Sequence, residues 1–387
     1  MNLETLNDQK WMRFTDELAD RAVEDLLKDG GRDGIASLSL ALQLLSNSPP
    51  DSPWPKGLRE FVSQVTMPRD ADQARINSAQ QWFSTWSVLA QATLFCASLP
   101  ETYCLPATAQ MLIISGQLVD HTTRRVKMTG QMLLSVMTPG GITEDSFALR
   151  ALRRTRLMHA AVRAMLMMEP KDARQRWSQE FGAPINQLGM VYTLMTFSHV
   201  VLRSVELLGI VPERQKCEDY IYAWNVAGDL LGVRPELLPA NRVEAELVFE
   251  RIKAAHARAL PETPALTKAL QESWCRQFKA NHLPLAVPVM HSLFQTLLTP
   301  ATRHLLGIPF PSRTVEEVNH LVTPAIEAFI RVTDEAFRVL PPLARLAAAV
   351  NHFLAISVKE EVQDGGLYDT RHHMAAWHDQ VSLSAGH

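Results

Sequence analysis

The residues best placed to do chemistry are Arg156, His159 and Arg163, within the run RLMHAAVR. On a helix that turns about 100° per residue, these three side chains fall within about 60° of arc. One imidazole therefore lies between two guanidinium groups on a single face. Burying two cations without partners costs several kcal/mol, so the pattern requires a source of negative charge.

A haem is one source of that charge. The neutral imidazole of His159 would bind the iron, and Arg156 and Arg163 would pair with the two propionates through charge-assisted hydrogen bonds. The alternative is an interior histidine on an amphipathic helix, with both arginines bridging to carboxylates elsewhere in the protein. The spacing alone leaves both explanations open.

The same helix resembles the signature of the family that includes the latex-clearing proteins (rubber oxygenases) and the fungal oxygenase that shortens a farnesyl side chain in mycophenolic acid biosynthesis. The family pattern is Arg, then His three residues on, then Arg four further, as at Arg156, His159 and Arg163. The resemblance covers roughly residues 75–245. Its other matches, in chain order, are Arg125, Thr129, Asn186, Gln187, the stretch 193–197, Trp224, Gly228, Gly232, Leu238 and Pro239.

The resemblance implies an all-α domain with a globin-like core that binds b-type haem, with His159 as the proximal iron ligand. It also implies that Arg125 and Thr129 line or support the haem pocket. Dioxygen and an apolar, unsaturated molecule are the expected reactants. His121 shares a predicted helix face with Arg125, so it is a candidate second axial ligand or acid–base group.

The sequence departs from the rubber-cleaving branch of this family. In that branch a lysine directly precedes the motif's threonine, and a glutamate on the preceding helix is placed to act as a base. Here Met128 precedes Thr129, and Asp120 is the only acid between residues 104 and 124. Without a base, proton abstraction from an allylic carbon is disfavoured unless His121 takes that role. We therefore expect a small apolar substrate rather than polymeric rubber.

The position opposite His159 has several candidate occupants. Met128 could ligate iron weakly or leave an open, apolar distal pocket, and the second of these is favoured because most methionines fill space. Lys127 projects about 100° away from Met128 on a helix and is a poor substitute for the missing lysine. His121 is the remaining candidate.

Helices must position all of these residues. The pattern predicts one over residues 143–170, with Thr143 as its N-cap and Pro170 at its end. A preceding helix reaches about Met137, and residues 139–141 form the turn between the two. The other predicted helices span residues 4–28, 35–45, 77–99, 185–209, 213–232, 242–259, 263–281, 288–298, 315–339 and 342–363. No strand alternation and no repeat of solenoid length is present, so the predicted fold class is all-α.

Three regions are predicted along the chain. Residues 1–57 form an N-terminal helical extension with a proline-rich crossover, residues 58–363 an all-helical haem-binding domain, and residues 364–387 a flexible tail. The tail carries His372, His373 and His378. On a helix His373 and His378 would point about 140° apart, so a solvated tail is favoured over a metal site.

Composition excludes several classes of function. The chain has 387 residues, 47% of them hydrophobic, and a net charge of −3, which gives no electrostatic footprint for nucleic acid. No secretory signal or uninterrupted transmembrane stretch is present, and we expect a cytoplasmic protein. Nucleotide-binding, serine-hydrolase and zincin motifs are missing. The four cysteines, which lack metal-binding spacing and are expected to be mainly reduced and buried, are Cys96, Cys104, Cys217 and Cys275.

Three hypotheses of function remain, and they belong to different classes. The leading one is a haem-dependent oxygenase acting on an apolar or unsaturated small molecule. The second keeps the haem but assigns a dehydrogenation or a peroxide-driven oxidation. The third is a non-enzymatic helical protein that binds haem or an apolar ligand. The 15 methionines and 14 phenylalanines are compatible with the adaptable apolar pocket that each hypothesis needs.

Overall fold

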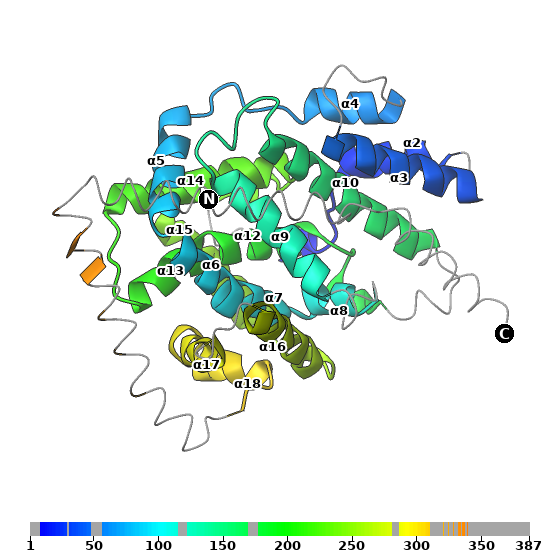
Figure 1. The fold of residues 1–387 in the computed structure, drawn as a ribbon. Helices are drawn as coiled ribbons and strands as arrows, with labels where there is room; N and C mark the ends of the chain where they lie inside the picture. Colours follow the sequence, from blue (N-terminus) through cyan, green and yellow to red (C-terminus); the bar gives the residue numbers. More distant parts are fainter. Residues whose placement is uncertain are drawn as a thin grey trace.

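The computed structural model confirms the all-α fold class. It describes residues 8–28, 31–47, 56–114, 122–168, 177–280 and 286–309, together with scattered helical positions between 320 and 339. Within these residues the secondary structure is helical and contains no strand (Figure 1). The predicted C-terminal tail, with His372, His373 and His378, lies outside the described residues.

The helices follow one another along the chain with short connections. In order they are α1 (Asp8–Trp11), α2 (Glu17–Leu27), α3 (Gly31–Asn47), α4 (Lys56–Gln64), α5 (Gln73–Thr85), α6 (Ser87–Thr93), the π-helix η2 (Leu94–Ser98), α7 (Leu99–Tyr103), α8 (Pro106–Ile114), α9 (Thr122–Met137), α10 (Phe147–Met168), η3 (Gln179–Phe181), α12 (Gln187–Phe197), α13 (His199–Leu207), α14 (Arg214–Leu230), η4 (Pro235–Leu237), α15 (Arg242–His256), α16 (Thr263–Ala280), α17 (Ala286–Leu297) and α18 (Pro300–Leu305).

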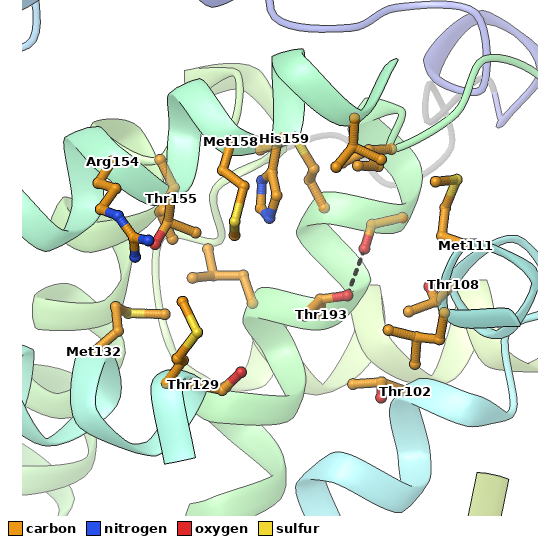
Figure 2. A pocket seen from close by; sticks show the side chains of 18 of the residues that line it. Thr102, Thr108, Met111, Thr129, Met132, Arg154, Thr155, Met158, His159 and Thr193 are labelled. Carbon is orange, nitrogen blue, oxygen red and sulfur yellow. Dashed lines mark hydrogen bonds between the residues drawn. The ribbon is translucent and has the colours of Figure 1, made fainter. Parts of the chain in front are cut away.

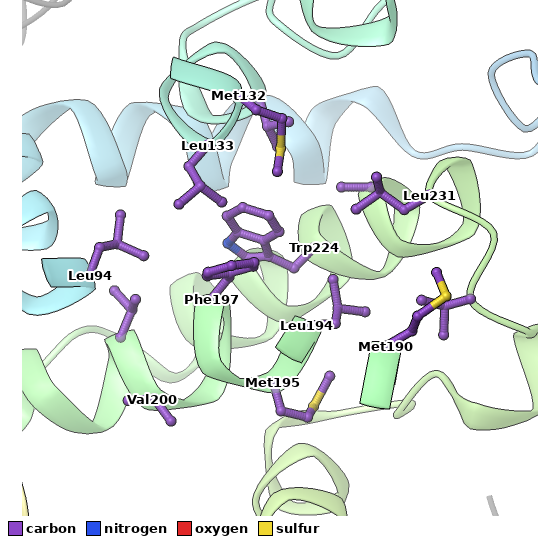
Figure 3. Close-up of a cluster of buried hydrophobic side chains, with 14 of the residues drawn as sticks. Leu94, Met132, Leu133, Met190, Leu194, Met195, Phe197, Val200, Trp224 and Leu231 are labelled. Atoms are coloured by element: carbon purple, nitrogen blue, oxygen red, sulfur yellow. The ribbon is translucent and has the colours of Figure 1, made fainter. Parts of the chain in front are cut away.

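The core is centred on the indole of Trp224 from α14, which is fully buried. Phe197 of α12 packs against it with ring centroids 5.7 Å apart. Figure 3 shows both rings surrounded by Met132 of α9 and by Leu194 and Leu231. These contacts hold α9, α12 and the C-terminal end of α14 in fixed relation to one another.

The N-terminal helices belong to this core. The structure corrects the interpretation of residues 1–57 as an appended element, because Ala19, Val23 and Leu26 of α2 are buried in the same hydrophobic cluster as the rest of the protein. In Figure 1, α2 and α3 lie against α10, and contacts join all three helices. The polar residues of α2 suggested a surface helix, but its apolar face is wide enough to be buried. The domain boundary at residue 57 stays a prediction.

The helix that carries His159 begins later than predicted. Thr143 lies in a turn, Asp145 adopts a left-handed conformation with φ of 61°, and α10 starts at Phe147. Its N-cap is Ser146, whose hydroxyl accepts a hydrogen bond from the backbone N–H of Leu149 at 3.0 Å. Glu144, expected in the first turn of the helix, instead accepts the N–H of Met67 at 3.0 Å. A tertiary contact has therefore displaced the capping role to the next hydroxyl residue.

Two other predicted helices are divided differently in the structure. The stretch 185–209 is two helices, α12 and α13, that meet at Ser198. The helix predicted to end at residue 99 does not stop there: α6, η2 and α7 follow one another without interruption from Ser87 to Tyr103, and the π-helix η2 lies directly before the turn that contains Pro100. All four cysteines are free thiols.

One stretch, Gln187–Leu207, has the length and mean hydropathy of a membrane-spanning segment. However, 83% of its most apolar window is buried inside the protein. A buried helical segment in the core of a protein has this same length and hydropathy.

Candidate functional site

A cavity of about 470 Å³ opens beside α10, within the range of small-molecule and cofactor sites. Its walls come from α7, α8, α9, α10 and α12, with Leu231 and Val233 closing one side. Figure 2 shows Arg154, Met158 and His159 projecting from α10 toward Thr129 and Met132 of α9. The helix hairpin predicted from the turn at residues 139–141 thus forms two walls of the cavity.

Most of the lining is apolar and unusually rich in methionine. The methionines that line the cavity are Met111, Met128, Met132, Met158, Met165 and Met190. Methionine is unbranched and polarisable, so a wall of this composition adapts to the shape of an apolar ligand.

The charges that face the cavity are positive. Arg150 and Arg154 line it together with His159, and none of the lining residues that the structure describes is Asp, Glu or Lys. The neutral hydroxyls add few donors: those of Thr102, Thr155 and Thr193 donate to carbonyl oxygens of their own helices, at 2.6–2.9 Å. A ligand with an anionic group would therefore find its partners at the two arginines.

The imidazole of His159 points into the cavity (Figure 2). Its Nδ1 is buried and has no hydrogen-bond partner among the described residues. Burial, reinforced by the positive charge of Arg163 and opposed by Asp16, lowers the pKa of His159 to about 4. The ring is therefore neutral at pH 7, which is the form that donates a lone pair to a metal.

Arg156 and Arg163 do not face the cavity, and the prediction that they pair with haem propionates is wrong. The guanidinium of Arg156 binds both carboxylate oxygens of Asp16, with Nε to Oδ2 at 2.6 Å and Nη2 to Oδ1 at 2.9 Å. Arg163 pairs with Asp20, whose Oδ1 lies 2.8 Å from Nε and 2.6 Å from Nη2. The alternative left open by the spacing, salt bridges to protein carboxylates, is what the structure contains.

The helical wheel explains how both arrangements fit the same spacing. His159 lies at the edge of the cavity-facing stripe of α10, and Arg156 and Arg163 lie about 40–60° beyond it, on the side of α2. Arg150 and Arg154 lie on the cavity-facing side and were missed by the sequence analysis. Their signal was present, because Arg154 and Met158 are spaced four residues apart on the apolar stripe that ends at His159.

The remaining predicted residues divide into three groups. Thr129 and Met128 line the cavity with His159, as expected from their helix face. Asn186 is the N-cap of α12, accepting the N–H of Gly189 at 3.0 Å, although it also borders the cavity. Lying outside the described part of the protein are His121 and the side chains of Arg125 and Lys127.

No group of three or more His, Cys, Asp or Glu side chains is arranged to hold a metal ion in the part of the chain that the structure describes. A metal bound to His159 would therefore need further ligands that these side chains do not provide, such as the nitrogen atoms of a porphyrin. The neutral imidazole, the partnerless Nδ1, the apolar wall and the two arginines fit a haem.

The fold and the site together define a helical protein with an apolar cavity whose described lining contains one histidine, His159. Residues 86–356 match the family described as "ER-bound oxygenase mpaB/B'/Rubber oxygenase, catalytic domain". This match spans more than half of the chain, so the chain belongs to that oxygenase family. The resemblance found in the residues around His159 is thereby confirmed.

Two relatives show how far the similarity extends. The rubber oxygenase of Streptomyces sp. (strain K30) is 26% identical over 220 residues, which are 56% of this chain and 53% of that protein. The chain thus spans about half the length of this relative. The solved structure of latex clearing protein LCP in the closed state superposes with a TM-score of 0.70 and 20% identity, over 88% of this chain and 91% of that one. At that identity the structural match supports the all-α fold alone.

Proposed function

We propose that this protein is a b-type haem-dependent oxygenase and that His159 holds the iron. The observation that carries the proposal is a neutral imidazole that points into a cavity of about 470 Å³ within an oxygenase family fold. When bound, the haem would supply the iron that activates dioxygen. The protein would supply the axial ligand, the apolar surroundings and the partners of the propionates.

We assign the propionates to Arg150 and Arg154. These are the cations among the described lining residues, and they lie on the same helix as the proposed axial ligand. Arg150 also donates to the carbonyl oxygen of Asp145 at 2.6 Å, which orients its guanidinium.

The proposed substrate is a small, apolar and unsaturated molecule. The methionine-rich wall favours a hydrocarbon surface, and the described lining has no carboxylate that could take a proton from an allylic carbon. We therefore do not propose polymeric rubber as the substrate, because its cleavage would begin with proton abstraction by such a carboxylate. Thr129 and Met128 border the space in which such a substrate would lie.

Oxygen consumption by the haem-loaded protein tests the proposed reaction. We expect uptake of dioxygen that depends on an added apolar alkene, with stoichiometric incorporation of labelled oxygen into the product. Turnover with peroxide but not with dioxygen would instead support a peroxide-driven oxidation. Haem binding without turnover in either assay would contradict the oxygenase assignment.

The propionate assignment gives a separate prediction. Arg154→Gln removes a charged hydrogen bond worth about 1.5–3 kcal/mol, so haem should dissociate roughly tenfold faster or more. Arg150→Gln should act in the same direction. Transfer of haem to a scavenger globin measures the rate, and Arg258→Gln, which breaks an exposed pair with Glu180, is the control. Rates equal to the parent in both cavity variants would exclude this role.

A further inference from the structure

Residues 11–20, here called the N-terminal strap, are joined to α10 and to the start of α12 by ion pairs and hydrogen bonds. We propose that Asp16 and Asp20 of this strap are positioning residues for His159: through Arg156 and Arg163 they set the orientation of the imidazole toward the cavity. The test of this inference with bound haem rests on the proposed function, whereas the test by amide hydrogen exchange without haem does not.

The two ion pairs lie one turn on either side of His159. Both are largely removed from solvent, with 13% of Arg156 and 5% of Asp16 exposed in one pair, and 6% of Arg163 and 23% of Asp20 in the other. Arg156 and Arg163 are seven residues apart, so their attachments are separated by about 10 Å along the helix axis. Two attachments at that separation fix both the rotation and the axial position of α10, whereas a single one would leave a pivot.

The strap is itself fixed by backbone hydrogen bonds to the start of α12. The carbonyl oxygen of Met12 accepts the N–H of Ala183 at 2.7 Å, and that of Phe14 accepts the N–H of Gln187 at 2.9 Å. The side-chain amide of Gln187 also donates to the carbonyl oxygen of Thr15 at 3.0 Å. Asp16 then caps α2 by accepting the N–H of Ala19 at 3.4 Å.

The same contacts reach the C-terminal end of α14. Gln187 donates to the carbonyl oxygen of Gly232 at 2.9 Å and accepts the N–H of Arg234 at 2.8 Å. Arg156 donates to the carbonyl oxygens of Asp229 and Leu230, each at 3.4 Å. The strap therefore joins three elements, α10, α12 and the end of α14, that each contribute residues to the cavity wall.

Gly232 shows how closely this junction is packed. Its backbone has φ of 87°, and a β-carbon at that position would collide with the Asp16 carboxylate and with Nε of Arg156. The ion pair thus fills the space beside the chain, and its geometry is set by the backbone around it. A salt bridge serving stability alone would not need both arginines to flank His159, which is the histidine in the described lining of the cavity.

Asp16→Asn and Asp20→Asn in the full chain test the inference. Each change removes the negative charge and replaces one acceptor oxygen with an NH2 donor, so it disrupts the pair with the arginine. Asparagine still caps a helix as well as aspartate does. The matched control is Asp219→Asn, which breaks a partly buried pair with Arg75 at 3.0 Å between α5 and α14. Asp16→Glu is the rescue variant, since it restores the charge.

Two readouts separate this inference from the proposed function. Without haem, amide hydrogen exchange along residues 156–163 should be roughly tenfold faster in either strap variant than in the parent and in Asp219→Asn. With haem, the electron paramagnetic resonance spectrum of the ferric protein should change, because the imidazole is reoriented, and Asp16→Glu should restore it. Should Asp16→Asn fail to fold, the more exposed Asp20→Asn preserves the test.

Parent-like exchange in both strap variants, or a parent-like ferric spectrum in both, would overturn the positioning role. If the parent itself binds no haem, the proposed function fails, and the exchange measurement still decides whether the strap orders the His159 helix.

Discussion

Two histidines of this protein, His159 and His199, have different surroundings. His159 faces a cavity in which a ligand can complete its interactions. His199, the first residue of α13, is only 2% exposed, packs against the ring of Phe249 with centroids 5.6 Å apart, and has no partner for either ring nitrogen among the described residues. Burial, reinforced by the positive charges of Arg203 and Arg242, lowers the pKa of His199 to about 3.

His199 should therefore make the protein less stable in acid. Its folded-state pKa lies below the unfolded value of 6.5, so between these values the unfolded chain binds the extra proton and the free energy of unfolding falls as the pH is lowered. His199→Phe removes this dependence and should lessen the loss of stability between pH 7.5 and 4.5 by roughly 2–3 kcal/mol. Urea unfolding at the two pH values measures it. The same pH dependence in the variant and the parent would exclude the assignment.

At the level of single residues, the sequence predicted the histidine and its cavity-facing neighbours Thr129 and Met128. It did not predict the partners of Arg156 and Arg163, since a helical wheel places side chains on a face but does not say which element that face meets. Asp16 and Asp20 carried the missing signal, being spaced four residues apart at the start of α2. Each pair joins residues about 140 positions apart in the sequence, and helical periodicity gives no information about contacts at that separation.

The start of α10 shows how an element's boundary depends on tertiary contacts. Thr143 has a suitable side chain for an N-cap, but its hydroxyl donates to the carbonyl oxygen of Gly140 at 3.3 Å, and Ser146 performs the capping. Ser146→Ala should lower the free energy of unfolding by about 1 kcal/mol, as loss of an N-cap does. Thr143→Ala should change it by less than about 0.5 kcal/mol, like an ordinary surface substitution.

Chemical denaturation of the two variants side by side measures this difference. If Thr143→Ala proves to be the more damaging change, the helix begins where the sequence pattern placed it. The helical pattern was readable over most of the chain, although α4 and α18 were not predicted. The boundaries at Ser146 and Ser198 depended on local polar contacts.

At the scale of the whole molecule, the junction of the strap with α10, α12 and α14 depends on a glycine. Gly232→Ala introduces a β-carbon into the Asp16–Arg156 pair at a positive φ, so it should destabilise the protein by about 2 kcal/mol or more. Gly130→Ala is the matched control, because Gly130 lies within α9 and a β-carbon there meets nothing within 4 Å. It should be neutral or stabilising by up to about 1 kcal/mol. Thermal unfolding followed by circular dichroism compares the two, and equal effects would mean that the junction is not tightly packed.

The overall architecture was predictable in class and in family, because the all-α pattern and the motif around His159 are both local in sequence. The sharing of one core by the N-terminal helices was not predictable. The proline-rich segment after α3 suggested a domain boundary. The burial of Ala19, Val23 and Leu26 shows instead that the helices before this segment pack into the same core as those after it. This packing matters for the site, because it places the strap against α10, the helix that carries His159.

The central claim is that His159 holds a haem in the cavity, and the visible absorption spectrum tests it most directly. The protein purified after expression with haem supply should show a Soret band with about one iron per chain, since one imidazole provides one axial site. His159→Ala should lose the band while its far-ultraviolet circular dichroism stays helical. A parent protein without a Soret band, or a His159→Ala variant with a full and unshifted one, would contradict the account.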